Sequence, residues 1–431
     1  MNKPVSSGEA MYAWATDLFP ICRSITGNGV RETLAYFKRL LPQLRIHEVP
    51  SGTYAFDWIV PDEWNIRGAW IADEQGNRIV DFADTNLHVV GYSVPVDEWM
   101  TLEELQPHLY SLPEQPDAIP YITSYYVKRW GFCLSHNQRE QLKPGRYHVV
   151  IDSTLAPGSL TYGDLLLPGR EKKEILLSTY ICHPSLANNE LSGPVVTAAL
   201  ASWLSGNDDR RFTYRILFIP ETIGSIVYLS RHLEEMKRNT IAGFVVSCVG
   251  DDRAYSLLRS RAEDTLADRA AKLVMKHHAP DYVEYSYLQR GSDERQYCSP
   301  GVDLPVVSVM RASYNGYPEY HTSLDDLSLI SPSGLAGGFE AIRKCIELLE
   351  HNYFYRPVLL CEPHLGGRGL YPTLGSRNTL PSVRSITNVL AYADGTRDLV
   401  DVADRIGLAP DEAVEIAETL KAAGLLEIAS D

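Results

Sequence analysis

Residues 174–204, EILLSTYICHPSLANNELSGPVVTAALASWL, decide the fold of this 431-residue chain. EILLSTYI is a short apolar run that predicts a buried strand, and SGPVVTAALASWL predicts a helix that follows soon after it. Ser192 is placed to cap this helix, and Pro194 falls in its first turn. A buried strand that leads into a helix is typical of an α/β sheet. The polar stretch from Cys182 to Glu190 therefore falls where the strand ends.

The alternation of strands and helices continues from this segment to about residue 354. YRILFI, IAGFVVSCV and LPVVSVM predict further strands, and amphipathic helical patterns follow the first two of them and close the region after the third. Residues 8–41 read as two helices joined by the turn-rich segment PICRSITGNG. We therefore predict an α/β domain, a mixed sheet flanked by helices, formed by residues 1–44 and 166–355.

Two other regions differ in their sequence pattern. Residues 45–165 contain short β-rich segments separated by turn signals, which predicts an inserted β-rich module. The stretch 356–382 is rich in Pro, Gly and Arg and reads as a linker. Three short helical patterns follow within 385–431. Residues 356–431 are thus predicted to form a linker and a winged-helix-like domain.

Charge and composition exclude several classes of function. The chain has 40 basic and 55 acidic side chains, and residues 385–431 alone carry three basic against ten acidic ones. Such an acidic surface would repel a phosphate backbone, so we expect no nucleic-acid partner. Seven cysteines without a CxxC pair are typical of a reducing compartment. Because no apolar stretch reaches the ~20 residues of a membrane span, and the first residues lack a signal-peptide pattern, we expect a cytoplasmic protein without a membrane partner.

Polar side chains gather in the loops that follow the predicted strands. Two histidines and several carboxylates are among them, and such loops converge at one edge of an α/β sheet. Imidazole and carboxylate are the ligand types that zinc prefers, and one carboxylate would remain to act as a base. The sequence therefore predicts a metal site built from the loops 182–190, 220–222, 250–252, 291–296 and 317–323.

Seven longer motifs carry a family resemblance that covers nearly the whole chain. The chain resembles the two-metal zinc aminopeptidases and, more closely, the aminopeptidase-like proteins described as polysaccharide-biosynthesis proteins, which carry a C-terminal winged helix. The resemblance implies a zinc-exopeptidase-like fold. The motifs are PICRSITGNGVRETL (20–34), NLHVVGYSVPV (86–96), IPYITSYYVKRWGFC (119–133), ICHPSLANNELSGP (181–194), PETIGS (220–225), GSDERQYCSPG (291–301) and PEYHTSLDDL (318–327).

Departures from the two-metal pattern change the expected metal count. Asn189 stands where that pattern has a bridging Asp, Thr222 where it has a second Glu ligand, and Ser247 near an expected Asp ligand. Two adjacent dications need several carboxylates to offset their repulsion, so one zinc per chain is favoured over two. The ligand set that the resemblance then implies is His183, Glu190 and His321, which leaves an open position for water.

Glu221 is the predicted general base. It would take a proton from the metal-activated water and return it to the leaving amine. The alternative is that Glu221 only interacts with the dipole at the start of the following helix.

Other polar residues near the predicted site have two interpretations each. Asp293 and Arg295 form either an internal ion pair or a substrate contact, in which Arg295 binds a carboxylate or an oxyanion. Asp251 either orients a ligand histidine or lies in a solvated turn. Asn189 is a further candidate for substrate or supporting contacts. Cys182 is a thiol nucleophile or, as we favour, a small buried residue.

The function predicted from these residues is a zinc-dependent hydrolase of an amide bond. It would act as an aminopeptidase or small-molecule amidase on a small-molecule or short peptide-like substrate. The alternative is an inactive scaffold that has kept the fold and lost ligands. The aromatic residues Tyr125, Tyr126 and Trp130 are either core of the β-rich module or a platform at the site mouth. The apolar positions of the tail exceed what three short helices can bury, so we expect some of them to pack against the α/β domain or a neighbouring subunit. The resemblance implies a homo-oligomer.

Overall fold

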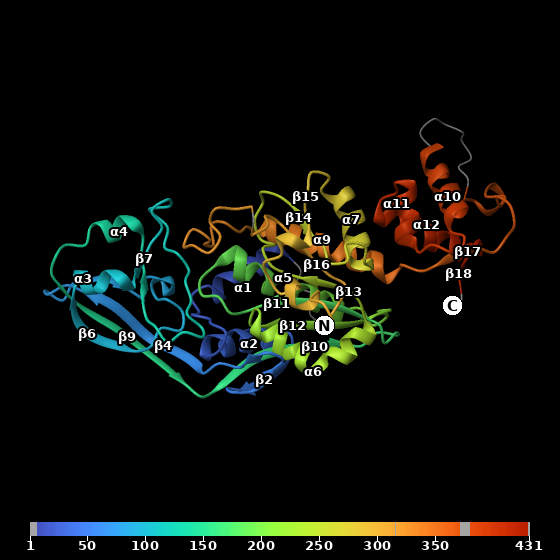
Figure 1. The fold of residues 1–431 in the computed structure, drawn as a ribbon. Coiled ribbons are helices and arrows are strands. Elements are labelled where there is room, and N and C mark those ends of the chain that lie inside the picture. The colour runs from blue at the N-terminus through green and yellow to red at the C-terminus, as the bar shows by residue number, and fades with distance from the viewer. Residues whose placement is uncertain (1–6, 315, 371–379, 430–431) are drawn as a thin grey trace.

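A mixed sheet of eight strands forms the centre of the molecule (Figure 1). The computed structural model describes residues 7–314, 316–370 and 380–429. The four central strands run parallel, and antiparallel pairs extend the sheet on both sides. In sheet order the strands are β1 (Arg45–Pro50), β10 (Ser159–Leu167), β12 (Thr213–Ile219), β11 (Glu174–Tyr180), β13 (Thr240–Val245), β16 (Val306–Met310), β14 (Ser256–Leu258) and β15 (Val283–Tyr285).

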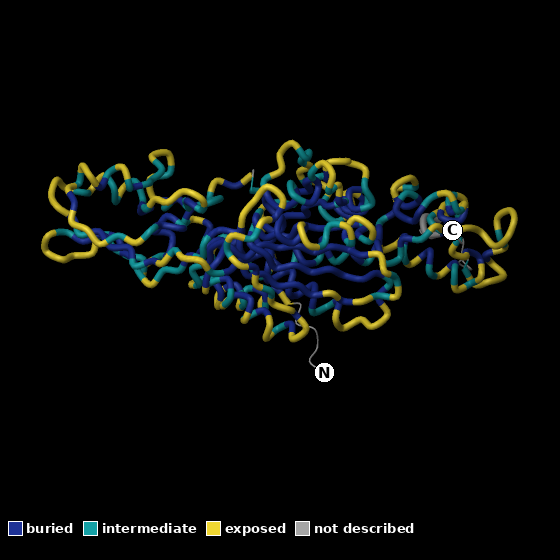
Figure 2. The backbone as a smooth tube through the Cα atoms, turned by 60° about the horizontal axis from the view of Figure 1, so that its bottom comes forward, coloured by how far each residue is buried: buried dark blue, intermediate teal, exposed yellow. Residues whose placement is uncertain are grey.

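Helices cover both faces of this sheet. Because side chains alternate along each strand, one face of β11 packs into one core cluster and the other face into a second. Figure 2 shows the buried backbone concentrated in this central layer. The first cluster contains α1 (Gly8–Leu18), α2 (Asn28–Leu40), α5 (Ser192–Ser205), α7 (Leu266–His278) and α9 (Pro332–Glu350); the second contains α6 (Ile223–Asn239) and part of α8 (Glu294–Tyr297).

The β-rich module has a four-stranded antiparallel sheet of its own, at the left of Figure 1. The two ends of the range predicted for it, 45–50 and 159–165, belong to the large sheet instead, as parts of β1 and β10. A strand looks the same in sequence whichever sheet it joins. The module strands are β5 (Arg78–Asp81), β4 (Glu63–Ala72), β9 (Arg146–Ala156) and β6 (Val96–Thr101); short pairs are β2 (Tyr54–Ala55) with β3 (Trp58–Ile59) and β7 (Leu109–Tyr110) with β8 (Phe132–Cys133), and the short helices are α3 (Leu102–Leu105) and α4 (His136–Glu140).

The C-terminal domain has three helices and a two-stranded wing. Its elements are β17 (Tyr355–Pro357), α10 (Leu380–Tyr392), α11 (Leu399–Ile406), α12 (Pro410–Ala422) and β18 (Leu426–Ile428), and β18 pairs with β17. Helix α11 packs on α7, and α12 contacts α7 and α9. This is the predicted winged helix, whose last apolar run is a strand and not a helix. The predicted linker lies partly outside the described residues, at 371–379.

Two details of the sequence prediction were wrong or incomplete. Ser192 does not cap α5, because a π-helical turn, Ala187–Leu191, leads directly into it and the Ser192 hydroxyl donates to the Asn188 carbonyl instead. Strands β14 and β15 were missed, since three residues are too few to show a period. Among the described helices, none combines the length and apolar character needed to cross a lipid bilayer.

Candidate metal and catalytic site

The first part of the site is the segment that follows β11. The strand ends at Tyr180, and His183 comes three residues later in a buried loop. The π-helical turn Ala187–Leu191 then carries Asn189 and Glu190, both buried. Single π-helical turns occur frequently at functional sites. Burial of so many polar groups in nine residues requires that each find a partner or serve a ligand.

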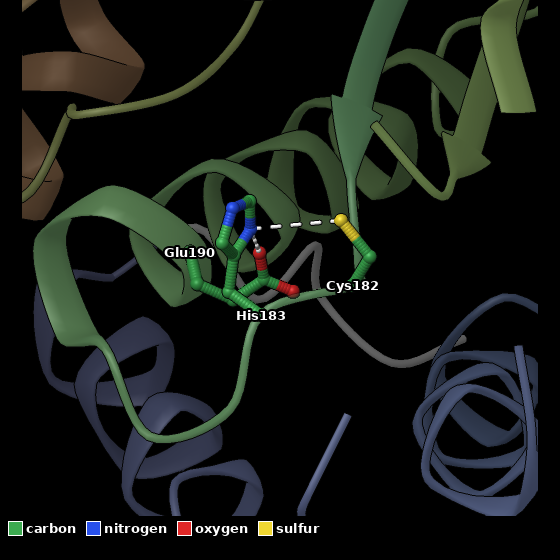
Figure 3. A group of neighbouring side chains, drawn as sticks. All are labelled: Cys182, His183 and Glu190. Carbon is green, nitrogen blue, oxygen red and sulfur yellow. Dashed lines mark hydrogen bonds and ion pairs between the residues drawn. The ribbon is translucent and has the colours of Figure 1, made fainter. Parts of the chain in front are cut away.

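Glu190 lies on the Nδ1 side of His183. The distance from His183 Nδ1 to Glu190 Oε2 is 2.8 Å, and Figure 3 shows this contact from the carboxylate to the ring. A carboxylate oxygen accepts hydrogen bonds, so Nδ1 is the ring nitrogen that donates to Glu190, and Nε2 is the one left to interact with another group. Burial by itself lowers the pKa of His183, but the hydrogen bond and charge of Glu190 outweigh it, and the pKa is raised.

Arg23 stands behind this pair and was missed in the sequence, although it lies in the quoted motif PICRSITGNG. Its Nε atom is 3.4 Å from Glu190 Oε1, and neither side chain is exposed to solvent. The guanidinium also donates to the backbone carbonyls of Leu18, His183 and Pro184. A lone arginine in a loop gives no signal in the sequence that it pairs with a residue 167 positions away.

Cys182 completes a small group on the same side as Glu190. Ligand atoms of Cys182, His183 and Glu190 lie within 4.8 Å of one another, and this is the one such group among the residues that the structure describes. The Cys182 Sγ atom is 3.6 Å from His183 Nδ1 and accepts a hydrogen bond from the Glu221 backbone N–H. Burial raises the pKa of this thiol, which keeps it neutral and inert. The cation of Arg23 beside Glu190 further disfavours a metal ion on the Nδ1 side.

Glu221 lies on the Nε2 side of the His183 ring, and the ring of His321 is also close to it. Glu221 Oε2 lies 3.8 Å from His183 Nε2, and its other oxygen accepts a hydrogen bond of 2.8 Å from Ser292. The ring centroids of His183 and His321 are 5.4 Å apart. Burial raises the pKa of Glu221, against the opposing effects of His183 and Ser292. A carboxyl group with a raised pKa is suited to proton transfer near neutral pH.

His321 is held in an unusual conformation. Its backbone has a φ of 57°, in the left-handed region, and its ring stacks on Tyr320 at 3.8 Å. Burial, and then the nearby charge of His183, lower the pKa of His321 to about 3, so its imidazole is neutral and available as a ligand. A strained non-glycine residue with a neutral buried imidazole is typical of a functional position.

Tyr121, from the β-rich module, closes the site and was not singled out in the sequence. Its ring makes edge contacts to His183 and His321, each at 5.1 Å, and its backbone N–H bonds to the His321 carbonyl. Its hydroxyl is 2.8 Å from that of Tyr125, which is partly buried against the module core. Tyr121 is one of five aromatic residues in the segment 119–133, and nothing in the sequence shows which of them contacts the histidines.

Tyr126 and Trp130, the other two residues predicted to lie in the module core or at the site mouth, do not contact the site histidines through such a hydrogen bond. Tyr126 is 53% exposed and lies against Trp58 of the short hairpin β2–β3. Trp130 stacks on His108 inside the module. Of the three aromatic residues named from the sequence, only Tyr125 is thus linked by a hydrogen bond to a residue that touches the histidines.

Asp293 and Arg295 both bond to the segment after Glu221 and not to each other. Asp293 Oδ1 accepts from the Thr222 N–H at 2.7 Å and from the Ser225 hydroxyl at 2.8 Å. Arg295 donates to the Thr222 hydroxyl at 2.7 Å. Burial and the charge of Glu221 raise the pKa of Asp293 to about 7. These contacts fix the loop that carries Glu221. Thr222 in this loop has a φ of 64°, in the left-handed region.

Asp251 is buried and organises the loops around the π-helical turn. It accepts hydrogen bonds from Asn188 Nδ2 and from the backbone N–H groups of Arg253 and Ala312. It therefore belongs neither to a solvated turn nor to the contacts of a histidine. Asp325, which the sequence analysis passed over, accepts from the backbone N–H groups of Asn188 and Asn189.

Several buried polar atoms of the site are suited to a bound cation. His321 Nε2, Asn189 Oδ1 and Ser247 Oγ are buried acceptors for which the described residues provide no hydrogen-bond partner. Inward-facing acceptors of this kind suit a cation.

Comparisons with known proteins agree with this architecture. A family model described as a domain of unknown function (DUF4910) matches residues 12–352, and a winged helix-turn-helix model matches residues 353–428. A Clostridium acetobutylicum protein, named as a candidate polysaccharide biosynthesis protein with an aminopeptidase-like domain, is 44% identical over 409 residues, 94% of this chain and 93% of its own length.

Solved structures show the same fold. The crystal structure of a candidate peptidase from Clostridium acetobutylicum is similar with a TM-score of 0.92 and 42% identity, over 98% of this chain and 96% of that one. A zinc aminopeptidase from Bacillus subtilis is similar with a TM-score of 0.57 and 10% identity, over 81% of this chain and 96% of that one. The second likeness is one of fold: a mixed α/β sheet flanked by helices.

Proposed function

This chain belongs to the DUF4910 family, and from that premise we propose that it is a metal-dependent hydrolase of an amide bond, aminopeptidase-like in chemistry, with one zinc ion per chain. One observation carries the proposal. The ring of His183 lies 5.4 Å, centroid to centroid, from the neutral imidazole of His321, and the Glu221 carboxylate is 3.8 Å from His183 Nε2. A small-molecule or short peptide-like substrate would bind at this point.

His183 and His321 are the residues proposed to hold the ion, both through Nε2. We revise the predicted role of Glu190, since its carboxylate is already bonded to His183 Nδ1 and paired with Arg23. Glu190 then supports the ligand histidine, as carboxylates commonly do. Bound zinc supplies Lewis acidity to an amide carbonyl and to water.

Glu221 is proposed to move the proton. Its Oε1 atom is held by Ser292, so Oε2 is the atom that accepts a proton from the attacking water and returns it to the leaving amine. Arg295 is proposed to bind the carboxylate or the developing oxyanion of the substrate. Its Nε atom is buried and has no hydrogen-bond partner among the described residues.

An inactive scaffold is the second candidate, and the neutral side chains Asn189, Thr222 and Ser247 favour it. Metal analysis of protein purified without added metal separates the two candidates. About one zinc per chain that is lost in both His183→Ala and His321→Ala supports the hydrolase. A metal-free chain that also takes up no added zinc supports the scaffold, and two zinc ions per chain contradict the single site.

We assign the winged helix a packing role without nucleic acid. Residues 385–431 carry a net charge of −7, and α12 packs against α7 and α9 of the α/β domain. DNA binding that weakens steeply with salt would contradict this assignment. A homo-oligomer and a cytoplasmic location remain predictions from the sequence, and sedimentation analysis tests the first of them.

A further inference from the structure

Arg23 is the most deeply buried cation beside the proposed site, and no role in catalysis has been assigned to it. It comes from the segment that joins α1 to α2, whereas the residues it contacts follow β11 on the central sheet. It is 1% exposed. A buried guanidinium must be paired and hydrogen-bonded, because an isolated charge there costs several kcal/mol.

Two of the contacts of Arg23 act on His183, one directly and one through Glu190. Its Nε atom donates to the His183 carbonyl at 2.8 Å and lies 3.4 Å from Glu190 Oε1. Its terminal nitrogens donate to the carbonyls of Leu18 at 2.8 Å and Pro184 at 3.3 Å. The guanidinium therefore fixes the backbone of His183 and, through Glu190, the ring as well.

The geometry points to Arg23 as the positioning residue of the site: it holds Glu190 as the acceptor for His183 Nδ1, so that Nε2 of His183 faces the ligand. The inference rests on the proposed function, in which that nitrogen binds zinc. A neutral side chain at position 23 would leave Glu190 as an unpaired buried charge. Glu190 would then turn away from this position, and the Nδ1 hydrogen bond would weaken.

Arg215 provides a matched control within the same chain. It forms a similarly buried pair with Glu174, through two hydrogen bonds of 2.7 and 2.9 Å, and also lies 3.1 Å from Glu235. Arg215 lies near the start of β12, opposite Leu176, whereas the site lies beyond the far ends of β11 and β12. Substitution of Arg215 thus breaks a comparable ion pair without touching the histidines.

The test compares Arg23→Met and Arg23→Lys with Arg215→Met and Arg215→Lys in the full-length chain. Lysine keeps a positive charge near Glu190 but lacks the guanidinium nitrogens that bond to three carbonyls. The Arg23→Lys variant therefore still tests the inference if Arg23→Met does not fold. One readout is the hydrogen-bonded Nδ1–H proton of His183 in metal-free, ¹⁵N-histidine-labelled protein, identified by its absence in His183→Gln. The other is the zinc dissociation constant, measured by competition with a chelator.

We expect both Arg23 variants to lose or shift the His183 Nδ1–H signal and to bind zinc about 10- to 100-fold more weakly, the usual cost of losing a supporting contact. The Arg215 variants should lose thermal stability and keep both properties. An unchanged Nδ1–H signal in folded Arg23 variants overturns the inference, and so does unchanged zinc affinity after the signal is lost. If the unaltered protein binds no zinc, the proposed function fails, while the proton signal still decides the role of Arg23.

Discussion

The proposed site and the contact with the winged helix each depend on an arginine that pairs with carboxylates of a distant segment, but water reaches the two clusters very differently. Arg23 and Glu190 have no exposed side-chain surface. Arg269 on α7, which binds Asp398 and Asp401 of the winged helix, is 28% exposed, and Asp401 is 45% exposed. Buried charges lose much when one partner is removed, whereas exposed ones are screened and rearrange.

The two clusters therefore have different roles: the buried one orients His183, and the exposed one helps to attach the winged helix to the α/β domain. At the site, Arg23 and Glu190 are fully buried and pair with each other, so we expect the group to behave as a unit that holds His183 in one orientation. At the domain contact, several weaker pairs add to the burial of apolar side chains, and the loss of one leaves the others in place. We therefore expect substitutions to have large, coupled effects in the first region and smaller, additive ones in the second.

The largest effect should come from Glu221→Gln. This change keeps the size of the side chain and the Ser292 contact but removes the proton acceptor. Turnover of an amide substrate should fall by roughly 100-fold or more, the usual scale for loss of a general base, while zinc content stays the same. Glu234→Gln, at an exposed position of α6, is the control and should leave turnover unchanged. Loss of zinc from Glu221→Gln would instead make this residue a ligand.

A smaller loss is expected when the winged helix is loosened. Asp398 caps α11 through the Asp401 N–H and bonds to Arg269 and Asn352, with only 6% of its side chain exposed. Asp398→Ala should lower the free energy of unfolding by about 2 kcal/mol, through loss of the cap and of the charged hydrogen bonds. Asp398→Asn keeps a good cap and should cost about half as much. Urea unfolding measures both, and equal stability of all three proteins would contradict the role of this contact.

Asp293 should make stability depend on pH. Its pKa is about 7 in the folded chain against an ordinary value of 3.8, so between pH 4 and 7 the folded state holds a proton that the unfolded state has lost. Stability should therefore fall as pH rises through this window, by up to about 1.4 kcal/mol per pH unit from this group. The slope should flatten in Asp293→Asn. It should move to lower pH in Glu221→Gln, because the charge of Glu221 contributes to the raised pKa. An identical slope in all three proteins would rule out the shift.

The smallest effect belongs to the outermost ion pair of the domain contact. Lys276 on α7 lies 3.3 Å from Asp404 on α11, and both side chains are more than half exposed. Lys276→Ala should change the free energy of unfolding by less than about 0.5 kcal/mol, and raised salt should not alter this difference appreciably. If Lys276→Ala lowered the free energy of unfolding as much as Asp398→Ala does, exposed and buried ion pairs would contribute alike to stability, and the expected difference between the two kinds of pair would be wrong.

Much of the fold could be predicted because its signals are local. The buried run EILLSTYI and the helical periods after it depend on neighbouring residues, and the predicted strands β11, β12, β13 and β16 all occur. The sheet that each β-rich segment joins could not be predicted. Residues 45–50 and 159–165 pair with each other and with β12, and these partners lie far away in the sequence.

The candidate site was predictable to the same extent. His183, Glu190, Glu221 and His321 lie in recognisable motifs, and the structure brings them together. Glu190 lies at Nδ1 of His183 and Glu221 near Nε2. This arrangement depends on side-chain rotamers and on Arg23, and the spacing of residues in the sequence does not reveal it. The role of Tyr121 depends on the docking of an entire module. For these reasons the residue types of the site were accessible, and its internal geometry was not.

The contact between the Tyr121 N–H and the His321 carbonyl also bears on how the chain folds. It joins residues 200 positions apart, and the pair of Arg23 with Glu190 spans another 167. Closing such long loops costs entropy before any contact repays it, so segments of this kind come together late in folding. The helices and the central strands can form from nearer neighbours. The proposed site is therefore expected to be among the last parts of the molecule to assemble, after the β-rich module has docked.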